Sequence, residues 1–122
     1  MSALSKPVLC IGNDPVSLNL RCGLLKEHGW DAASSGNAHD GLFRLKRESF
    51  CAVILDLNDD GAEGALVASQ VKRQDPNIPV VMIITDPEKL LAGATEQADA
   101  IVLKSDETEF LPIRLRGLIS DR

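Results

Sequence analysis

The sequence contains no tyrosine, and only three phenylalanines and one tryptophan occur among its 122 residues. Its core must therefore be aliphatic, because leucine, valine, isoleucine and alanine supply most of the apolar side chains. No apolar run approaches the roughly 20 residues that a membrane-spanning helix needs. The first ten residues, MSALSKPVLC, lack the charged start, long apolar run and cleavage site of a secretory signal. We therefore expect a cytoplasmic protein with no membrane partner.

Cysteine is also scarce, and the three cysteines form no CxxC pair. An odd number without that spacing indicates neither a disulfide framework nor a zinc site. Cys10, Cys22 and Cys51 each lie in an apolar stretch, so we interpret them as small, reduced core residues.

Positive charge is in deficit, because 13 lysines and arginines face 18 aspartates and glutamates, a formal net charge of −5. This balance argues against direct nucleic-acid binding. The basic pairs Lys46-Arg47 and Lys72-Arg73 are isolated from one another and resemble solvated helix ends. A chain of this length can bury roughly two-thirds of its unfolded surface. We therefore predict a single domain over residues 1–122.

Short apolar runs alternate with amphipathic stretches along the whole chain. Strict alternation of strands and helices predicts an α/β fold in which helices cover both faces of a parallel sheet, a three-layer α/β/α sandwich. The predicted strands are 7–12, 30–34, 52–55, 78–84 and 100–103, and the predicted helices are 14–29, 38–48, 61–74, 86–97 and 108–119.

The first and last helices carry local signals. Asp14 followed by Pro15 is typical of a helix start, with aspartate as the N-cap. Leu20, Leu24 and Leu25 recur at helical spacing, which predicts that they face inward. Proline is best tolerated in a first helical turn, so Pro112 predicts that the last helix begins close to that residue.

Polar side chains follow three of the predicted strands directly. Asp56 ends CAVILD, Thr85 follows IPVVMII, and Lys104 follows IVL. Because the carboxyl ends of parallel strands meet at one edge, these side chains should converge, and ligands bind there in such folds. An aspartate could accept a phosphoryl group while a hydroxyl donates a hydrogen bond and an ammonium neutralises charge.

These residues resemble those of the receiver domains of two-component response regulators. The best-matching stretches are LLKEHGW at 24–30, ILDLNDDGAEG at 54–64, IPVVMIITD at 78–86 and IVLKS at 101–105. The resemblance implies a flavodoxin-like sheet of strand order 2-1-3-4-5. It implies that Asp56 is the phosphoacceptor, Thr85 the switch hydroxyl and Lys104 the phosphate-contacting lysine. Asn58 would lend its backbone carbonyl to a magnesium ion.

The sequence departs from the family where the metal is held. Receivers usually carry two adjacent acids after the first strand, and here Gly12 and Asn13 stand there. Asn13 can offer only a neutral carbonyl, and Asp14, one place later, is better explained as a helix cap than as a ligand. We therefore expect weak Mg²⁺ binding, with Asp56 as the one certain carboxylate ligand.

Two functional hypotheses follow from the resemblance. In the first, the chain is a phosphoacceptor that receives phosphate on Asp56 from a histidine kinase or phosphotransfer protein, with at most slow self-phosphorylation and autodephosphorylation. In the second, it is a degenerate receiver that binds proteins independently of phosphorylation, which Gly12, Asn13, Asp86 and Ile101 favour. A small-ligand flavodoxin-like protein would need a phosphate-binding glycine loop, and GNDPVS is not one.

The resemblance also implies where a downstream protein docks. Receivers commonly present a face made by their fourth helix, fifth strand and fifth helix. In this sequence those elements are predicted at 86–97, 100–103 and 108–119.

Overall fold

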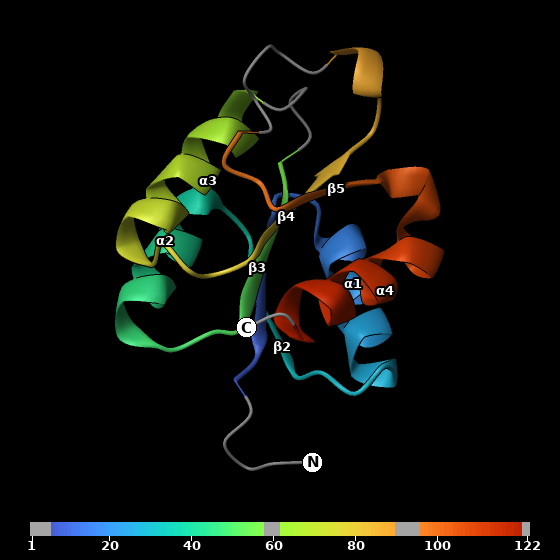
Figure 1. The fold of residues 1–122 in the computed structure, drawn as a ribbon, viewed down its shortest axis with the longest axis horizontal. Helices are drawn as coiled ribbons and strands as arrows, with labels where there is room; N and C mark the ends of the chain where they lie inside the picture. Colours follow the sequence, from blue (N-terminus) through green and yellow to red (C-terminus); the bar gives the residue numbers. More distant parts are fainter. Residues whose placement is uncertain (1–5, 58–61, 90–95, 121–122) are drawn as a thin grey trace.

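The computed structural model describes residues 6–57, 62–89 and 96–120. Five parallel strands form one sheet in the order β2-β1-β3-β4-β5, which confirms the predicted fold. Figure 1 shows α2 and α3 on one face of the sheet and α1 and α4 on the other. The elements are β1 Val8–Gly12, α1 Pro15–Glu27, β2 Ala32–Ser35, α2 Ala38–Arg47, β3 Ala52–Asp56, α3 Ala62–Gln74, β4 Val80–Ile84, the 3-10 turn η1 Pro87–Lys89, β5 Ala100–Leu103, the 3-10 turn η2 Lys104–Asp106 and α4 Glu107–Ser120.

The sheet separates two apolar cores. Strands β1, β3 and β4 are buried along their whole length because helices cover both of their faces. Successive residues of a strand point to opposite faces, so each central strand contributes to both cores. Leu9 and Leu55 pack beneath α2 and α3 with Val67 and Val71 of α3. The other core, beneath α1 and α4, contains Val8, Cys10, Ala52, Ile54, Leu18, Leu25, Leu111 and Leu115.

Helix α1 begins as predicted, but it presents a different face to the sheet. Asp14 is the N-cap and Pro15 the first helical residue. The inward residues are Leu18, Arg21 and Leu25, whereas Leu20 is 69% exposed. The prediction that Leu20 faces inward was therefore wrong. The helix is rotated so that an arginine occupies part of its buried stripe.

The last helix also differs from the prediction. The turn η2 leads directly into α4, which begins at Glu107, so Pro112 lies inside the helix rather than near its start. Of the helix predicted at 86–97, the structure describes η1 and residues 96–97, and residues 90–95 lie outside the described part.

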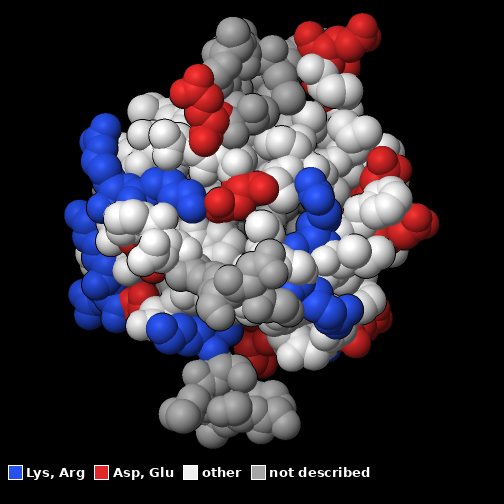
Figure 2. Space-filling view, in the orientation of Figure 1, with Lys and Arg blue, Asp and Glu red and all other residues white. Residues whose placement is uncertain are grey.

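Charge is unevenly distributed over the surface. Lysine and arginine gather on the side formed by α2 and α3, as Figure 2 shows, although the chain is acidic overall. Arg44, Lys46 and Arg47 lie in the last turn of α2, and Lys72 and Arg73 in the last turn of α3. These positions complement the negative end of each helix dipole. Within the described ranges, no helix has the length and apolar character needed to cross a bilayer.

Candidate functional site

The candidate site is centred on Asp56, the last residue of β3. Asp56 pairs in register with Gly12 at the end of β1, so it lies at the carboxyl edge of the sheet. Residues 52 and 54 of the same strand face the core beneath α1 and α4, and the alternation of a strand places Asp56 on that side too. Its side chain is only 3% exposed. A carboxylate buried to this extent requires charged or hydrogen-bonding partners.

One partner is Lys104, the first residue after β5. Its Nζ lies 2.9 Å from Oδ2 of Asp56, and its side chain remains 29% exposed. The structure therefore brings together two of the three residues that the strand ends predict. Thr85 follows β4 directly at the same edge of the sheet, and its side chain is exposed.

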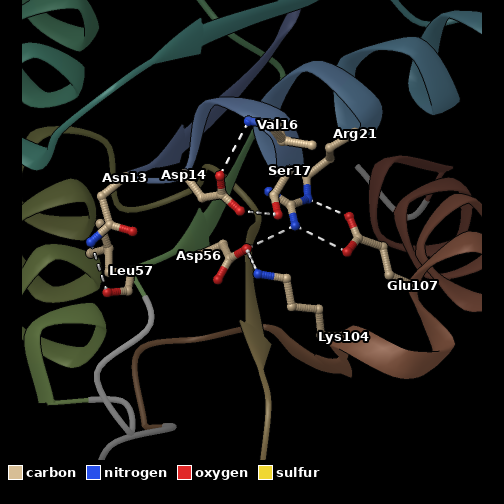
Figure 3. A network of polar contacts seen from close by, with 9 residues as sticks. All are labelled: Asn13, Asp14, Val16, Ser17, Arg21, Asp56, Leu57, Lys104 and Glu107. Atoms are coloured by element: carbon tan, nitrogen blue, oxygen red, sulfur yellow. Dashed lines mark hydrogen bonds and ion pairs between the residues drawn. The ribbon is translucent and has the colours of Figure 1, made fainter.

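The second partner of Asp56 is Arg21, which the sequence analysis did not identify. Nη2 of Arg21 lies 2.9 Å from the same Oδ2 atom, and only 1% of the arginine is exposed. Arg21 also contacts Glu107 at the start of α4, where Nε donates to Oε2 and Nη2 donates to Oε1 at 3.0 Å. Figure 3 shows the guanidinium lying between the two carboxylates. Two carboxylates and two cations therefore form one cluster.

The protonation of Arg21 is secured by this cluster. Burial lowers the pKa of its guanidinium, but the hydrogen bonds and negative charges of Glu107 and Asp56 outweigh burial, so the net shift is upward. Arginine is in any case protonated across the physiological range. Asp56 therefore has a permanent positive charge beside it.

The polar side chains after β1 form hydrogen bonds with groups other than Asp56. Asn13 is exposed, and its Nδ2 donates to the carbonyl oxygen of Leu57 at 3.1 Å. Asp14 caps α1: Oδ1 accepts from the backbone N–H of Val16 at 3.2 Å, and Oδ2 accepts from Oγ of Ser17 at 2.8 Å. The Ser17 hydrogen bond lowers the pKa of the Asp14 carboxyl. This matches the interpretation of Asp14 as a helix cap.

The described residues do not fit a magnesium ion. No three histidine, cysteine, aspartate or glutamate side chains cluster to hold a metal in the ranges that the structure describes. Oδ2 of Asp56 already meets two cations, which would repel a divalent ion at close range. The backbone carbonyl of Asn58, predicted as a further ligand, lies outside the described residues.

Gly12 contributes a steric restriction to the same edge. A Cβ atom at this position would lie 2.9 Å from the backbone carbonyl oxygen of Asp56 and 3.4 Å from Cδ2 of Leu18. Any larger residue would force β1 and β3 to shift. An acid at position 12 is therefore incompatible with the observed spacing of these two strands.

The sequence indicates the role of Arg21 in part, but it does not indicate the role of Glu107. Arg21 falls three residues after Leu18 and four before Leu25, so it lies on the apolar stripe of α1, where a charge is unusual. A correct choice of the helix face would have revealed it. Glu107 gives no local signal, because its role depends on a partner 86 residues away.

Comparisons with known proteins identify proteins that are similar to this chain in sequence and in fold. No family model matches the chain. It is 25% identical over 114 residues to the probable transcriptional regulatory protein TcrX of Mycobacterium tuberculosis, covering 92% of this chain and 49% of TcrX. It is 28% identical over 119 residues to the DNA-binding response regulator MtrA of Mycolicibacterium smegmatis, and the match covers 96% of this chain and 52% of MtrA. The chain thus spans about half the length of these curated relatives.

Solved structures share the fold. The response regulator TrrA of Thermotoga maritima, in complex with Mg²⁺-BeF, superposes with a TM-score of 0.83 at 21% identity, covering 93% of this chain and 98% of TrrA. The receiver domain of a histidine kinase from Syntrophus aciditrophicus gives a TM-score of 0.83 at 20% identity, and the match covers 96% of this chain and 92% of that domain. With the strand order, these likenesses show that the chain has the receiver-domain fold, and its sequence is similar to that of a DNA-binding response regulator.

Proposed function

We propose that Asp56 is the phosphoacceptor of a two-component phosphorelay and takes its phosphoryl group from the phosphohistidine of a histidine kinase or phosphotransfer protein. The observation that carries this proposal is the buried carboxylate at the end of β3 with Nζ of Lys104 at 2.9 Å. A carboxylate oxygen of Asp56 attacks phosphorus, the phosphorus–nitrogen bond breaks, and its electron pair returns to the imidazole nitrogen.

The neighbouring side chains have complementary roles in this step. Lys104 neutralises charge on the transferring group as a point cation. Thr85, at the end of β4, supplies a hydroxyl that can donate to a phosphoryl oxygen once the group is in place. Beyond slow self-phosphorylation and autodephosphorylation at Asp56, the chain has no enzymatic activity in this proposal. Residues 1–122 act as one receiver domain in the cytoplasm.

A downstream protein would dock on the face formed by β5 and α4. An apolar pocket lies there, lined by Ile101, Leu103 and Phe110 together with Val102, Asp106 and Arg114. Phe110 is 43% exposed, so an incoming side chain can pack against its ring. This face includes two of the three elements through which receivers commonly bind their partners.

The test is transfer from a phosphorylated histidine kinase, followed by intact-protein mass spectrometry and peptide mapping. We expect one added phosphoryl group on Asp56, absent in Asp56→Asn. The matched control is Asp31→Asn, because Asp31 is exposed and lies before the edge strand β2. Phosphorylation of the control but not of Asp56→Asn supports the proposal. If neither a kinase nor a small phosphodonor phosphorylated the chain, the proposal would be wrong. The hypothesis of a degenerate receiver that binds proteins independently of phosphorylation would then replace it.

A further inference from the structure

We propose that the Arg21 guanidinium takes the place of the divalent cation at Asp56, so that this receiver accepts a phosphoryl group without a metal ion. The inference rests on the proposed function of Asp56 as the acceptor. It concerns what neutralises the site, which is a separate question from whether Asp56 is modified.

The first argument is charge balance. A receiver with two adjacent acids, an acceptor aspartate and a lysine has an excess of negative charge that a divalent ion offsets. In this chain the ion pairs join Asp56 and Glu107 to Arg21 and Lys104, so the formal charges of these four groups cancel. A divalent ion added here would leave two uncompensated charges beside a buried arginine. A phosphoryl group would meet two cations that are already in place.

The second argument is an unused hydrogen-bond donor. Nη1 of Arg21 is buried and bonds to no partner among the residues that the structure describes. Glu107 occupies the side of the guanidinium formed by Nε and Nη2, while Asp56 accepts from Nη2. In a planar guanidinium the remaining N–H of Nη2 and one N–H of Nη1 point in parallel from the end of the fork. Nη1 is therefore directed past the same carboxylate, where it can donate to a phosphoryl oxygen.

The third argument is preorganisation. The paired contact with Glu107 fixes the plane of the Arg21 guanidinium, which is 1% exposed. Donors that are held in place before a reaction need no reorganisation when charge develops, and they act strongly where water is excluded. Because Glu107 and Asp56 engage Nε and Nη2, Nη1 is the guanidinium group that is left to donate to a phosphoryl oxygen. Glu107 thus positions Arg21, and Arg21 contacts the transferred group.

The experiment compares phosphorylation with and without metal. The full chain is stripped of metal and reacted with phosphoramidate, once in EDTA and once in MgCl₂, and the phosphorylated fraction is followed by intact mass. We expect the wild type to react in EDTA at a rate within about threefold of that in MgCl₂, because a charge-assisted arginine contact supplies the stabilisation. Asp56→Asn should not react in either buffer.

Two variants test Arg21 itself. The double variant Arg21→Leu/Glu107→Leu removes one charge of each sign, and we expect its rate in EDTA to fall roughly tenfold or more, as for loss of a hydrogen bond to a charged group. The matched control, Arg44→Leu/Glu48→Leu, removes an exposed ion pair of α2 and should react like the wild type. Arg21→Lys keeps the charge but lacks the Nη1 donor. Its rate in EDTA should therefore lie between that of the wild type and that of the Arg21→Leu/Glu107→Leu variant.

The outcomes separate the two proposals. Modification of Asp56 in MgCl₂ alone would overturn the role of Arg21 and leave the phosphoacceptor function standing. An unchanged rate in both Arg21 variants would overturn it as well. If Asp56 were modified in neither buffer while circular dichroism showed a folded chain, the proposed phosphoacceptor function, on which the inference rests, would be wrong.

Discussion

Nη2 of Arg21 and Oδ2 of Asp56 lie 2.9 Å apart, with side chains that are 1% and 3% exposed. A helix residue and a strand residue 35 positions apart thus form an ion pair from which water is nearly excluded. Pairs of this kind are costly to break from one side only, because the remaining charge stays buried without compensation. The stability of the fold therefore depends on the same guanidinium to which we assign a role in the proposed chemistry of Asp56.

Arg21→Leu should destabilise the fold by about 3–5 kcal/mol, as expected when one member of a buried ion pair is removed. Glu107 then loses its ion pair with Arg21, whereas Asp56 keeps its ion pair with Lys104. Urea unfolding followed by far-ultraviolet circular dichroism measures the change.

The double variant Arg21→Leu/Glu107→Leu is the control for this prediction. Replacing both charges with apolar side chains should be neutral or stabilising by up to about 4 kcal/mol relative to the wild type. If the double variant were as unstable as the single one, lost packing rather than an uncompensated charge would be the cause.

Gly12→Ala should lower the free energy of unfolding by roughly 1–3 kcal/mol, the usual cost of overpacking a tight site. The added Cβ would lie 2.9 Å from the carbonyl oxygen of Asp56. Gly23→Ala is the matched control, since nothing lies within 4 Å of its Cβ position inside α1. That substitution should stabilise the fold by about 0.5–1 kcal/mol through helix propensity. Equal effects at the two positions would contradict the close approach of β1 and β3.

Ser17→Ala should raise the pKa of Asp14, because the Ser17 hydroxyl is the largest cause of its lowered value. In the wild type the folded carboxyl has a lower pKa than the unfolded one. Its contribution to stability is therefore present above the unfolded pKa and lost as the pH falls through the folded pKa. Carbon-detected NMR titration of the Asp14 carboxyl gives the pKa directly. An unchanged titration in Ser17→Ala would show that the backbone N–H groups alone hold the carboxylate.

Cys22 should be the first cysteine to react with iodoacetamide, with a rate that rises through about pH 7. A hydrogen bond from Cys10 lowers the pKa of the Cys22 thiol to about 7, and the positive charges of Lys26 and Arg21 act in the same direction. The Cys10 thiol, buried in β1, has a raised pKa from the same hydrogen bond and from burial.

The Cys10→Ala variant tests the origin of this reactivity. Without the Cys10 hydrogen bond, the inflection for Cys22 should move toward the ordinary thiol value of about 8.5. Peptide mapping after alkylation at a series of pH values assigns the rates. An inflection that stayed near pH 7 in the variant would assign the shift to the neighbouring cations instead.

The fold was predictable because its signals are local. Apolar runs such as IPVVMII indicate strands buried on both faces, and their alternation with amphipathic stretches leaves few topologies. The convergence of Asp56 and Lys104 followed from the rule that parallel strands end at one edge. The rotation of α1 was harder to predict from the sequence, because Leu20 and Leu18 belong to two different apolar stripes of the same helix. Only tertiary packing selects the stripe that contains Arg21.

The Arg21–Glu107 contact joins residues that are 86 positions apart, which has a consequence for the order of folding. Closing so long a segment costs chain entropy before the contact can contribute any stabilisation. The guanidinium can reach Glu107 only after β5 has joined the sheet and α4 has docked. We expect the contact to be absent from the folding transition state, so that removing it accelerates unfolding while leaving the folding rate nearly unchanged. The cluster around Arg21 would then determine how long each molecule stays folded rather than how quickly it folds.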